Sequence, residues 1–520
     1  MASETKAQRV ERIKREKDGL DVIEDIHRYA AGNVPVDDET IDRLKWYGMY
    51  LQRDEEDANE EQFFMLRVKL TNGELSKEQL KAILDISKNY ARQTLNLTVR
   101  QDVQFHYIKI QDVPKVFELL HEVGLNSIMA AGDVPRNVVS CPLCDVSEDS
   151  IVNTKNVVRQ INKMFEANKE FSNLPRKFKI GINGCKKHCI YHEIQDLGFT
   201  AFLHETGVLF DVTVGGGLSG GKQIAKRLGL ACREEDIAKI AKATALIFKE
   251  HGNRENRAKA RMRHLIDEWG VQKFTQELLG HIDIDFVTVD EPRITEKYSR
   301  NHIGIEKQQN GLYSIGCATN SGRLRAEGVQ KILSILDTYG LDQIIITTTQ
   351  DFIITGAAFA DLASIQNDLK PVFVANPMAL QATTLACTGS EFCKFALTET
   401  KQFAKRLIDE ISEEIPNCPI PVNIHIAGCN NSCSQPQVAD IGLIATFLKD
   451  KEDKRVQGYE VYLGGYLKGE QSEFNKKIAV KLPIEGVSTY IINILKDYLE
   501  HFSALEDFHG YLRRQTKEVT

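Results

Sequence analysis

The sequence predicts an α+β protein that is built from an internally duplicated unit. Residues 63–108 and 311–356 each read as strand, glycine-containing turn, amphipathic helix, strand, turn and strand. A helical stretch follows each block, at residues 113–125 and 359–369. The same order of elements in the two halves is the first observation that indicates duplication.

The second part of each half repeats as well. Chance similarity between common strand–turn patterns is the alternative, but several matches in one order favour duplication. The matching segments are RNVVSCPLCDVS (136–147) with ATTLACTGSEFCKFA (382–396), KFKIGINGCKKHCIYHEIQDLGFTAFL (177–203) with PVNIHIAGCNNSCSQPQVADIGLIATFL (421–448), and DVTVGGGLSGG (211–221) with YEVYLGGYLKG (459–469).

Composition excludes some classes of function. The 520 residues carry a net charge of −7, which argues against a general nucleic-acid binder. The first 21 residues have no apolar core of a signal peptide, and no run reaches the ~18 apolar residues typical of a membrane span. We therefore expect a cytoplasmic protein with no membrane or nucleic-acid partner. In that reducing compartment, closely paired cysteines indicate metal or redox chemistry.

Four cysteines of the second half have the spacing of an iron–sulfur site. Cys387 and Cys393 are separated by five residues, and Cys429 and Cys433 by three. Four thiolates are the usual ligands of a [4Fe–4S] cluster, and neighbouring glycines allow the backbone to approach it closely. Zinc is one alternative, although the five-residue gap is unusual for it. Buried free cysteines without a metal are the other.

The segments ACTGSEFC and AGCNNSC resemble the siroheme-bridging cluster motif of the assimilatory sulfite and nitrite reductases. Further segments resemble the same family in the same order, over residues 45–515. They are YGMYLQRDEED (47–57), FMLRVKLTNG (64–73), LTVRQDVQFH (97–106), GDVPRNV (132–138), LPRKFK (174–179), VGGGLS (214–219) and HGNRENRAKAR (251–261).

The resemblance implies an architecture and two cofactors, siroheme and a [4Fe–4S] cluster. Two ferredoxin-like half-domains would combine into one lobe, and two siroheme/cluster-binding α/β lobes would complete the fold. Cys433 would bridge the cluster to the siroheme iron. The expected domains are an N-terminal helical extension (1–54), the first half-domain (55–128), the first siroheme-type domain (129–290), the second half-domain (303–375) and the second siroheme domain (376–520).

The resemblance also implies a cationic substrate site made by Arg67, Arg136, Lys177 and Lys179. Arginine offers a planar fork to an oxyanion, and lysine offers a compact charge and a proton. Lys177 and Lys179 are two apart, so on an extended chain they face the same side. A lone arginine in an apolar strand, such as Arg67, is more simply a solvated charge, and the four matches together favour a site.

Lys179 bears on the substrate. Sulfite reductases of the family tend to have lysine here, and plant-type nitrite reductases tend to have asparagine. An additional cation suits sulfite, so we expect six-electron reduction of sulfite to sulfide. Reduction of nitrite to ammonia is the alternative, and a non-catalytic iron–sulfur or zinc protein is a third.

The eight carboxylates of siroheme need donors of their own. Arg100, Gln104 and His106 alternate along LTVRQDVQFH, which predicts one strand face; an exposed polar face is the simpler explanation. The loop of Gly215, Gly216 and Gly217 could supply N–H groups to an anion or could be an ordinary turn. Asn431 matches a family position near siroheme. Arg254, Arg257 and Arg261 fit either a propionate site or a solvated helix face.

Four cysteines of the first half, Cys141, Cys144, Cys185 and Cys189, depart from the family pattern. They occupy the repeat positions of the cluster ligands, with spacings of two and three residues. A second iron–sulfur cluster, a zinc site and a metal-free remnant of duplication are all open.

The sequence contains no flavin or nicotinamide fingerprint. GGGLSGGK (215–222) lacks both the dinucleotide-binding spacing and the phosphate-loop spacing. Electrons must then come from another protein, either a ferredoxin or a separate flavoprotein.

Overall fold

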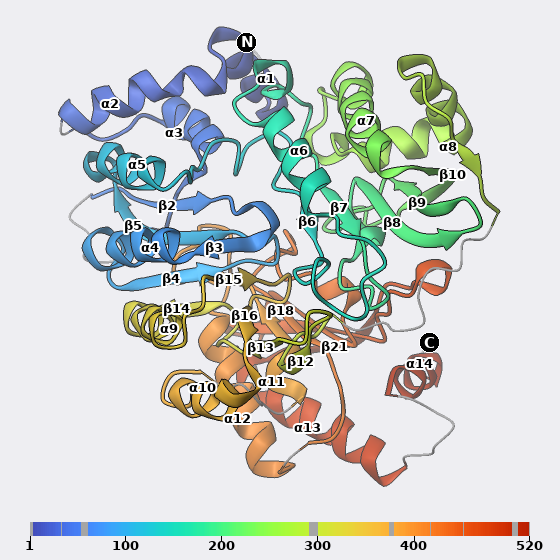
Figure 1. Cartoon of the computed structure of the whole chain (residues 1–520). Helices are drawn as coiled ribbons and strands as arrows, with labels where there is room; N and C mark the ends of the chain where they lie inside the picture. The colour runs from blue at the N-terminus through green and yellow to red at the C-terminus, as the bar shows by residue number, and fades with distance from the viewer. Residues whose placement is uncertain are drawn as a thin grey trace.

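Two five-stranded antiparallel sheets are formed by the repeated blocks of the computed structural model (Figure 1). The structure describes residues 4–32, 34–53, 61–290, 300–373, 379–416, 418–450, 452–501 and 508–518. The first sheet has the order β1 (Met49–Leu51), β2 (Phe63–Val68), β5 (Val103–Lys109), β4 (Thr94–Leu97), β14 (Arg323–Arg325). The second has the order β12 (Gly304–Lys307), β13 (Tyr313–Cys317), β16 (Phe352–Ala357), β15 (Gln343–Ile346), β3 (Glu74–Ser76).

Each half-domain completes the sheet of the other. Leu324 on β14 lies opposite Leu95 on β4, and Leu75 on β3 lies opposite Ile344 on β15. These two short strands lie between the predicted glycine-containing turn and the amphipathic helix of each block. The exchange explains physically how the two half-domains combine into one lobe.

Helices cover the two sheets. In α4 (Lys77–Tyr90) the first turn is fixed by Ser76 and Gln79, whose side chains bond each other's backbone N–H groups. The helix packs against α9 (Ala326–Thr338) of the other half. The remaining helices of this lobe are α5 (Val113–Glu122) and α10 (Leu362–Leu369).

The two cysteine-bearing segments form two further lobes, which confirms the predicted duplicated α+β fold. The first sheet has the order β11 (Val287–Thr288), β10 (Lys226–Cys232), β9 (Gly207–Val214), β8 (Leu197–His204), β7 (Ile180–Asn183), β6 (Val139–Ser140). The second has the order β17 (Thr384–Ala386), β18 (Ile424–Ala427), β19 (Ile441–Lys449), β20 (Arg455–Leu463), β21 (Lys476–Pro483). Strand pairs β6–β7 and β17–β18 are parallel, and β8–β9 and β19–β20 are antiparallel.

Amphipathic helices bury the apolar faces of these lobes. The first lobe, green in Figure 1, carries α6 (Lys155–Phe165), α7 (Ile237–His251) and α8 (Met262–His281). The second carries α11 (Ala379–Thr383), α12 (Lys401–Glu414), α13 (Ile484–Glu500) and α14 (Phe508–Glu518). One continuous apolar core joins the first lobe to both half-domains, and the second lobe has a core of its own.

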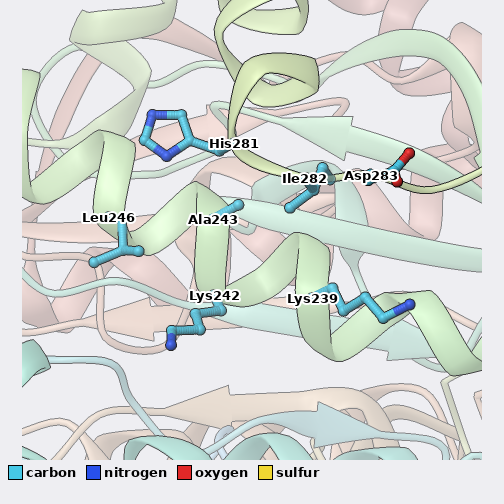
Figure 2. Close-up of a pocket in the computed structure, with 7 residues that line it drawn as sticks. All are labelled: Lys239, Lys242, Ala243, Leu246, His281, Ile282 and Asp283. Atoms are coloured by element: carbon cyan, nitrogen blue, oxygen red, sulfur yellow. The ribbon is translucent and has the colours of Figure 1, made fainter.

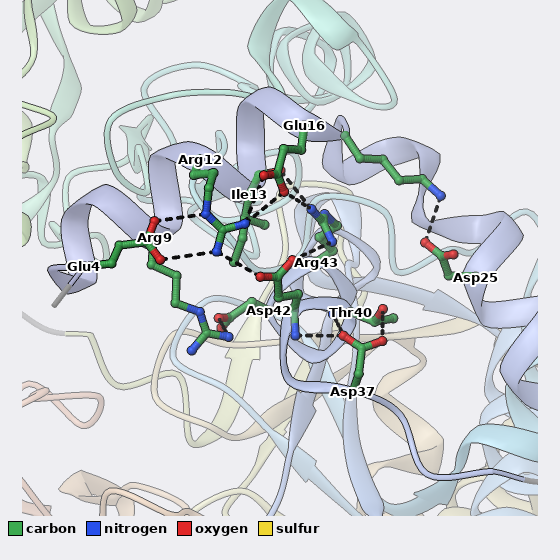
Figure 3. A network of polar contacts seen from close by, with 12 residues as sticks. Glu4, Arg9, Arg12, Ile13, Glu16, Asp25, Asp37, Thr40, Asp42 and Arg43 are labelled. Carbon is green, nitrogen blue, oxygen red and sulfur yellow. Dashed lines mark hydrogen bonds and ion pairs between the residues drawn. The ribbon is translucent and has the colours of Figure 1, made fainter. Parts of the chain in front are cut away.

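The N-terminal extension is helical, with α1 (Lys6–Glu16), α2 (Ile23–Gly32) and α3 (Asp38–Leu44), although β1 near its end joins the first sheet. Figure 3 shows the polar network that joins α1 to α3, in which the Arg12 guanidinium contacts carboxylates of Glu4, Glu16 and Glu39. These side chains are solvent-exposed, so screening by water keeps the contribution of each pair to stability small. Residues 54–57 of the YGMYLQRDEED segment and linker residues 291–299 lie outside the described residues.

Among the described residues, no helix combines the length and the apolar character that a membrane-crossing segment needs.

Candidate functional site

The cysteines of the second lobe gather at one edge of its sheet. Cys387 follows β17 directly, and Cys429 follows β18 by two residues. Ala386 lies opposite Ile426 in the parallel pair, so both strands end at the same edge. The two cysteine pairs are therefore brought together by strand register rather than by sequence proximity.

These four cysteines differ in their exposure to solvent. Cys387, Cys393 and Cys429 are partly buried, and Cys433 is exposed. Burial, together with the nearby Cys433 thiolate, raises the pKa of Cys387 to about 12. Burial and the same thiolate also raise the pKa values of Cys393 and Cys429. The chemistry of this donor set fits a [4Fe–4S] cluster whose exposed ligand is Cys433.

A buried lysine and a partly buried arginine, both missed by the sequence reasoning, support the cluster loop. Lys401, at the start of α12, donates to the Ser321 carbonyl, and burial with the nearby Arg323 lowers its pKa to about 7. Arg323 pairs with Glu391 at 2.7 Å and lies over the Phe392 ring. Each lies in a segment with other basic residues, such as Arg325 and Lys405, so no sequence pattern distinguishes it from a surface charge.

Lys177 and Lys179 lie in the extended segment before β7, with Phe178 and Ile180 buried between and after them. This alternation of burial places the side chains of Lys177 and Lys179 on the same side of the segment, as predicted. Burial, and repulsion from Arg261 and Arg136, lower the pKa of Lys177 to about 7, while Cys433 opposes this shift. Burial and Arg100 lower the pKa of Lys179 as well. Lys177 thus lies within electrostatic reach of both Cys433 and the arginines.

Arg67 and Arg136 converge on the same carbonyl group. Nη1 of each donates to the Ala130 oxygen at 3.2 Å. Arg136 also donates to Gly132 at 2.7 Å. Tyr50, absent from the sequence-based site, lies beside them: burial opposes ionisation of its hydroxyl, but Arg136 and Arg67 lower its pKa overall.

Gln104 and His106 lie on β5, but Arg100 lies in the turn before it, which corrects the prediction that all three share a strand face. The turn arises because β4 ends at Leu97 and Gln101 takes a positive φ of 55°. When the Gln104 amide is oriented with its oxygen toward Arg67, this oxygen accepts from Arg67 Nη2 and Nε at 2.6 and 3.0 Å. Arg100 donates to the carbonyl oxygen of Asn137 at 2.7 Å.

Two of the three N–H groups in the glycine loop are bonded within the protein. Gly215 N donates to the Asp196 carbonyl at 2.9 Å, and Gly217 N donates to Gln223 at 2.8 Å. The glycines are instead required by close packing. A Cβ at Gly217 would lie 2.7 Å from a guanidinium nitrogen of Arg263, a residue that the sequence reasoning missed.

Unpaired donors give a test of whether siroheme fits. Several buried nitrogens have no hydrogen-bond partner among the described residues: Arg136 Nε, Arg261 Nε, Arg263 Nε and Nη1, Arg323 Nη2, and both ring nitrogens of His106. Burial lowers the pKa values of His106 and Arg263; Arg323 and Arg67 add to the shift of His106, and Arg261 adds to that of Arg263. Arg67 also acts on Arg136, and Arg136 and Arg261 both act on Lys177, so these groups belong to one electrostatically connected region. Buried donors require partners, and a macrocycle with eight carboxylates supplies them.

The other predicted contacts differ in their surroundings. Asn431 is exposed and lies beside Cys429. Arg254 pairs with Glu11, Arg257 with Asp133 and Arg261 with Asp196, so these guanidinium groups bind protein carboxylates and are not a free basic face. A surface hollow between α7 and the end of α8 contains none of the predicted site residues (Figure 2). Its lining is Lys239, Lys242, Ala243, Leu246, His281, Ile282 and Asp283.

Comparison with known protein families places this site in a defined class. The nitrite and sulphite reductase 4Fe-4S domain matches residues 131–285 and 378–518. The nitrite/sulfite reductase ferredoxin-like half domain matches residues 56–123 and 305–372. The chain belongs to the nitrite and sulphite reductase family, and it is an oxidoreductase with siroheme and [4Fe–4S] as its cofactors.

Individual relatives align with almost the whole chain. A sulfite reductase [ferredoxin] of Mycobacterium tuberculosis (strain H37Rv) is 31% identical and covers 98% of this chain and 95% of its own. A ferredoxin–nitrite reductase of Leptolyngbya laminosa is 32% identical, with 96% and 98% covered. The solved structure of the Mycobacterium tuberculosis NirA protein superposes with a TM-score of 0.92 and 30% identity, covering 97% and 96% of the two chains.

Proposed function

We propose that this enzyme reduces sulfite to sulfide by six electrons, with substrate held by Arg67, Arg136, Lys177 and Lys179. The observation that carries the proposal is that the backbone N–H of Arg136 donates to the Phe178 carbonyl, between Lys177 and Lys179, at 2.8 Å, while Lys177 also lies within electrostatic reach of Cys433. It connects the exposed cluster ligand to the cationic set. When bound, siroheme supplies an iron that binds the anion, and the cluster supplies electrons.

The side chains have separate tasks in this proposal. Arg67 and Arg136, fixed by the Ala130 carbonyl, retain N–H groups for sulfite oxygens. Lys177, with a pKa of about 7, can hold a proton near neutral pH and release it to an oxygen that leaves as water. Cys387, Cys393, Cys429 and Cys433 hold the cluster, with Cys433 as the thiolate shared with siroheme.

The remaining polar groups would hold the macrocycle. Arg100, Gln104 and His106 would bind its carboxylates, and Asn431 would contact it beside the cluster cysteines. The glycines at 215–217 keep the backbone close, so that Arg261 and Arg263 reach the same ligand. Because relatives are named as ferredoxin-dependent sulfite and nitrite reductases, a ferredoxin is the proposed electron donor, with a separate flavoprotein as the alternative.

Sulfite is preferred over nitrite because Lys179 adds a cation to the site. Sulfite carries more charge than nitrite near neutral pH and has three oxygens, so it gains more from that cation. Nitrite remains the second candidate, since the aligned relatives carry both names.

Steady-state turnover of the purified holoenzyme with reduced methyl viologen tests the proposal. We expect sulfite to be reduced to sulfide with a higher kcat/KM than nitrite to ammonia. Cys433→Ser should abolish both activities and alter the siroheme absorption bands. Cys418→Ala, at a buried cysteine outside the site, is the control that should keep both. Full turnover by Cys433→Ser would remove the proposed bridging role, and faster nitrite reduction would reverse the substrate assignment.

A further inference from the structure

Cys141, Cys144, Cys185 and Cys189 form a small cluster of their own within the first lobe. Their exposed fractions are 2%, 1%, 1% and 0%, so none is accessible to solvent. Cys141 follows β6, and Cys185 follows β7 by two residues; Ser140 and Ile182 are opposite each other in this parallel pair. Strand register therefore gathers these cysteines as it gathers the cluster ligands of the second lobe.

The sulfur atoms are packed more closely than a cluster with several irons requires. Cys185 Sγ and Cys189 Sγ are 3.0 Å apart, and both cysteines are free. The ligand atoms of Cys141, Cys189 and His302 all lie within 4.8 Å of one another. Among the described residues, the four cysteines of the second lobe form no group this compact. Thiolates of a cube bind separate irons, whereas thiolates of a single ion share one centre.

His302 supplies an independent observation that points to a ligand. It comes from the linker just before β12, has an exposed fraction of 6%, and has no hydrogen-bond partner among the described residues at either ring nitrogen. An unsatisfied buried polar group destabilises the folded state. A bound metal ion would satisfy one nitrogen of this imidazole.

We propose that Cys141, Cys185, Cys189 and His302 bind one Zn²⁺ ion with tetrahedral geometry. Three cysteines and one histidine form a recognised structural zinc set, and Cys185 and Cys189 have a three-residue spacing within the zinc range. Binding would deprotonate three thiols and release three protons, leaving a site with a net charge of −1. With four protein ligands it has no open position, so its role is structural.

Cys144 lies beside this ligand set and not within it. Its Sγ accepts a hydrogen bond from Thr154 Oγ1 at 3.4 Å, which gives this sulfur a protein partner. The ion would fasten the segment before β12 to the first lobe, joining the linker to the sheet edge formed by β6 and β7. Metal removal should therefore loosen the contact between the two halves of the chain.

Metal analysis of the purified holoenzyme tests the proposal directly. We expect one zinc and about five irons per chain, the irons being those of one cube and one siroheme. X-ray absorption at the zinc edge should give three sulfur neighbours at ~2.3 Å and one nitrogen at ~2.0 Å. About nine irons without zinc would show a second cube, and about five irons without zinc would show buried thiols without metal. Either result overturns the proposal, and neither affects the proposed sulfite reduction.

Variants test the ligand set. His302→Ala and Cys185→Ser should each lower the zinc content at least tenfold while iron stays at about five per chain. Cys144→Ser should retain zinc, and loss of zinc there would overturn the ligand assignment. Cys232→Ala, at a buried lone cysteine of the same lobe, is the matched control. Should a ligand variant fail to fold, the zinc content and zinc-edge spectrum of the unaltered enzyme still decide the question.

Discussion

The backbone N–H of Gly428 donates a hydrogen bond to Cys387 Sγ at 3.1 Å, across the parallel pair β17–β18. This bond connects the two cysteine-bearing loops directly, without a metal between them. Hydrogen bonds to cluster sulfurs orient the ligands and influence the reduction potential. The contact therefore couples strand register to the electronic properties of the site.

Gly428→Ala should lower the cluster content of the enzyme. A Cβ at this position would lie 2.8 Å from the Ala396 Cβ, so the loop must shift away from Cys387. We expect at least a twofold loss of iron and acid-labile sulfide per chain, measured on purified protein. Gly280→Ala, where an added Cβ meets nothing within 4 Å, should keep normal iron content. Normal iron in both variants would show that this contact is dispensable.

Arg263→Gln should weaken siroheme binding. Arg263 is 3% exposed, and its Nε and Nη1 atoms have no hydrogen-bond partner among the described residues. Charge-assisted hydrogen bonds to a carboxylate contribute about 1.5–3 kcal/mol, or roughly 10- to 100-fold in affinity. The ratio of siroheme absorbance to protein measures the loss. Arg254→Gln, whose guanidinium bonds Glu11 and Asn173, should leave that ratio unchanged.

Lys179→Asn should shift the substrate preference from sulfite toward nitrite. Removal of this cation weakens the site more for the anion with the higher charge. We expect the ratio of kcat/KM for sulfite over nitrite to fall at least fivefold. The comparison uses reduced methyl viologen and both anions at one pH. An unchanged ratio would remove the argument for sulfite that rests on this residue.

Asp133 should make the fold sensitive to acid. Although burial opposes its ionisation, Lys14 and Arg257 hold the pKa of this buried carboxyl far below its usual value. A depressed pKa stabilises the folded state above about pH 4, and this contribution is lost as the pH falls further. Asp133→Asn should therefore destabilise the protein by about 3–5 kcal/mol at pH 7, because it leaves buried cations unpaired.

Apparent melting temperature between pH 3 and 7 measures this effect. The variant should melt well below the unaltered protein at pH 7, and the difference should shrink as the pH approaches 3. Asp337→Asn, at an exposed ion pair with Lys77, should change melting by little at any pH. A constant difference across the range would exclude Asp133 ionisation as its origin.

The fold class and the cluster segment could be predicted from the sequence. The duplicated order of elements and the spacing of Cys387, Cys393, Cys429 and Cys433 predicted the fold class and the cluster segment, because repeated periodicity and paired thiolates are local patterns. The alternation of Lys177 and Lys179 around buried Phe178 also follows from period-two geometry.

Other features depend on contacts between distant segments. The sequence predicts a strand at Arg100 because glutamine, the residue at position 101 where the chain turns, does not require a positive φ. Arg263 and Arg323 lie in segments without a recognisable motif. Only their buried nitrogen atoms, which have no hydrogen-bond partner among the described residues, distinguish them. His302 has no local motif, since its thiol neighbours are more than a hundred residues away.

The exchanged strands β3 and β14 also affect the order in which this protein can mature. Arg323 on β14 contacts Asn96 on β4, 227 positions earlier in the chain. During synthesis the first half-domain therefore emerges with an open sheet edge, which remains exposed until the ribosome has made the second. In its present form neither half-domain completes its sheet alone, so we expect the prosthetic groups to be loaded only after both halves have been made.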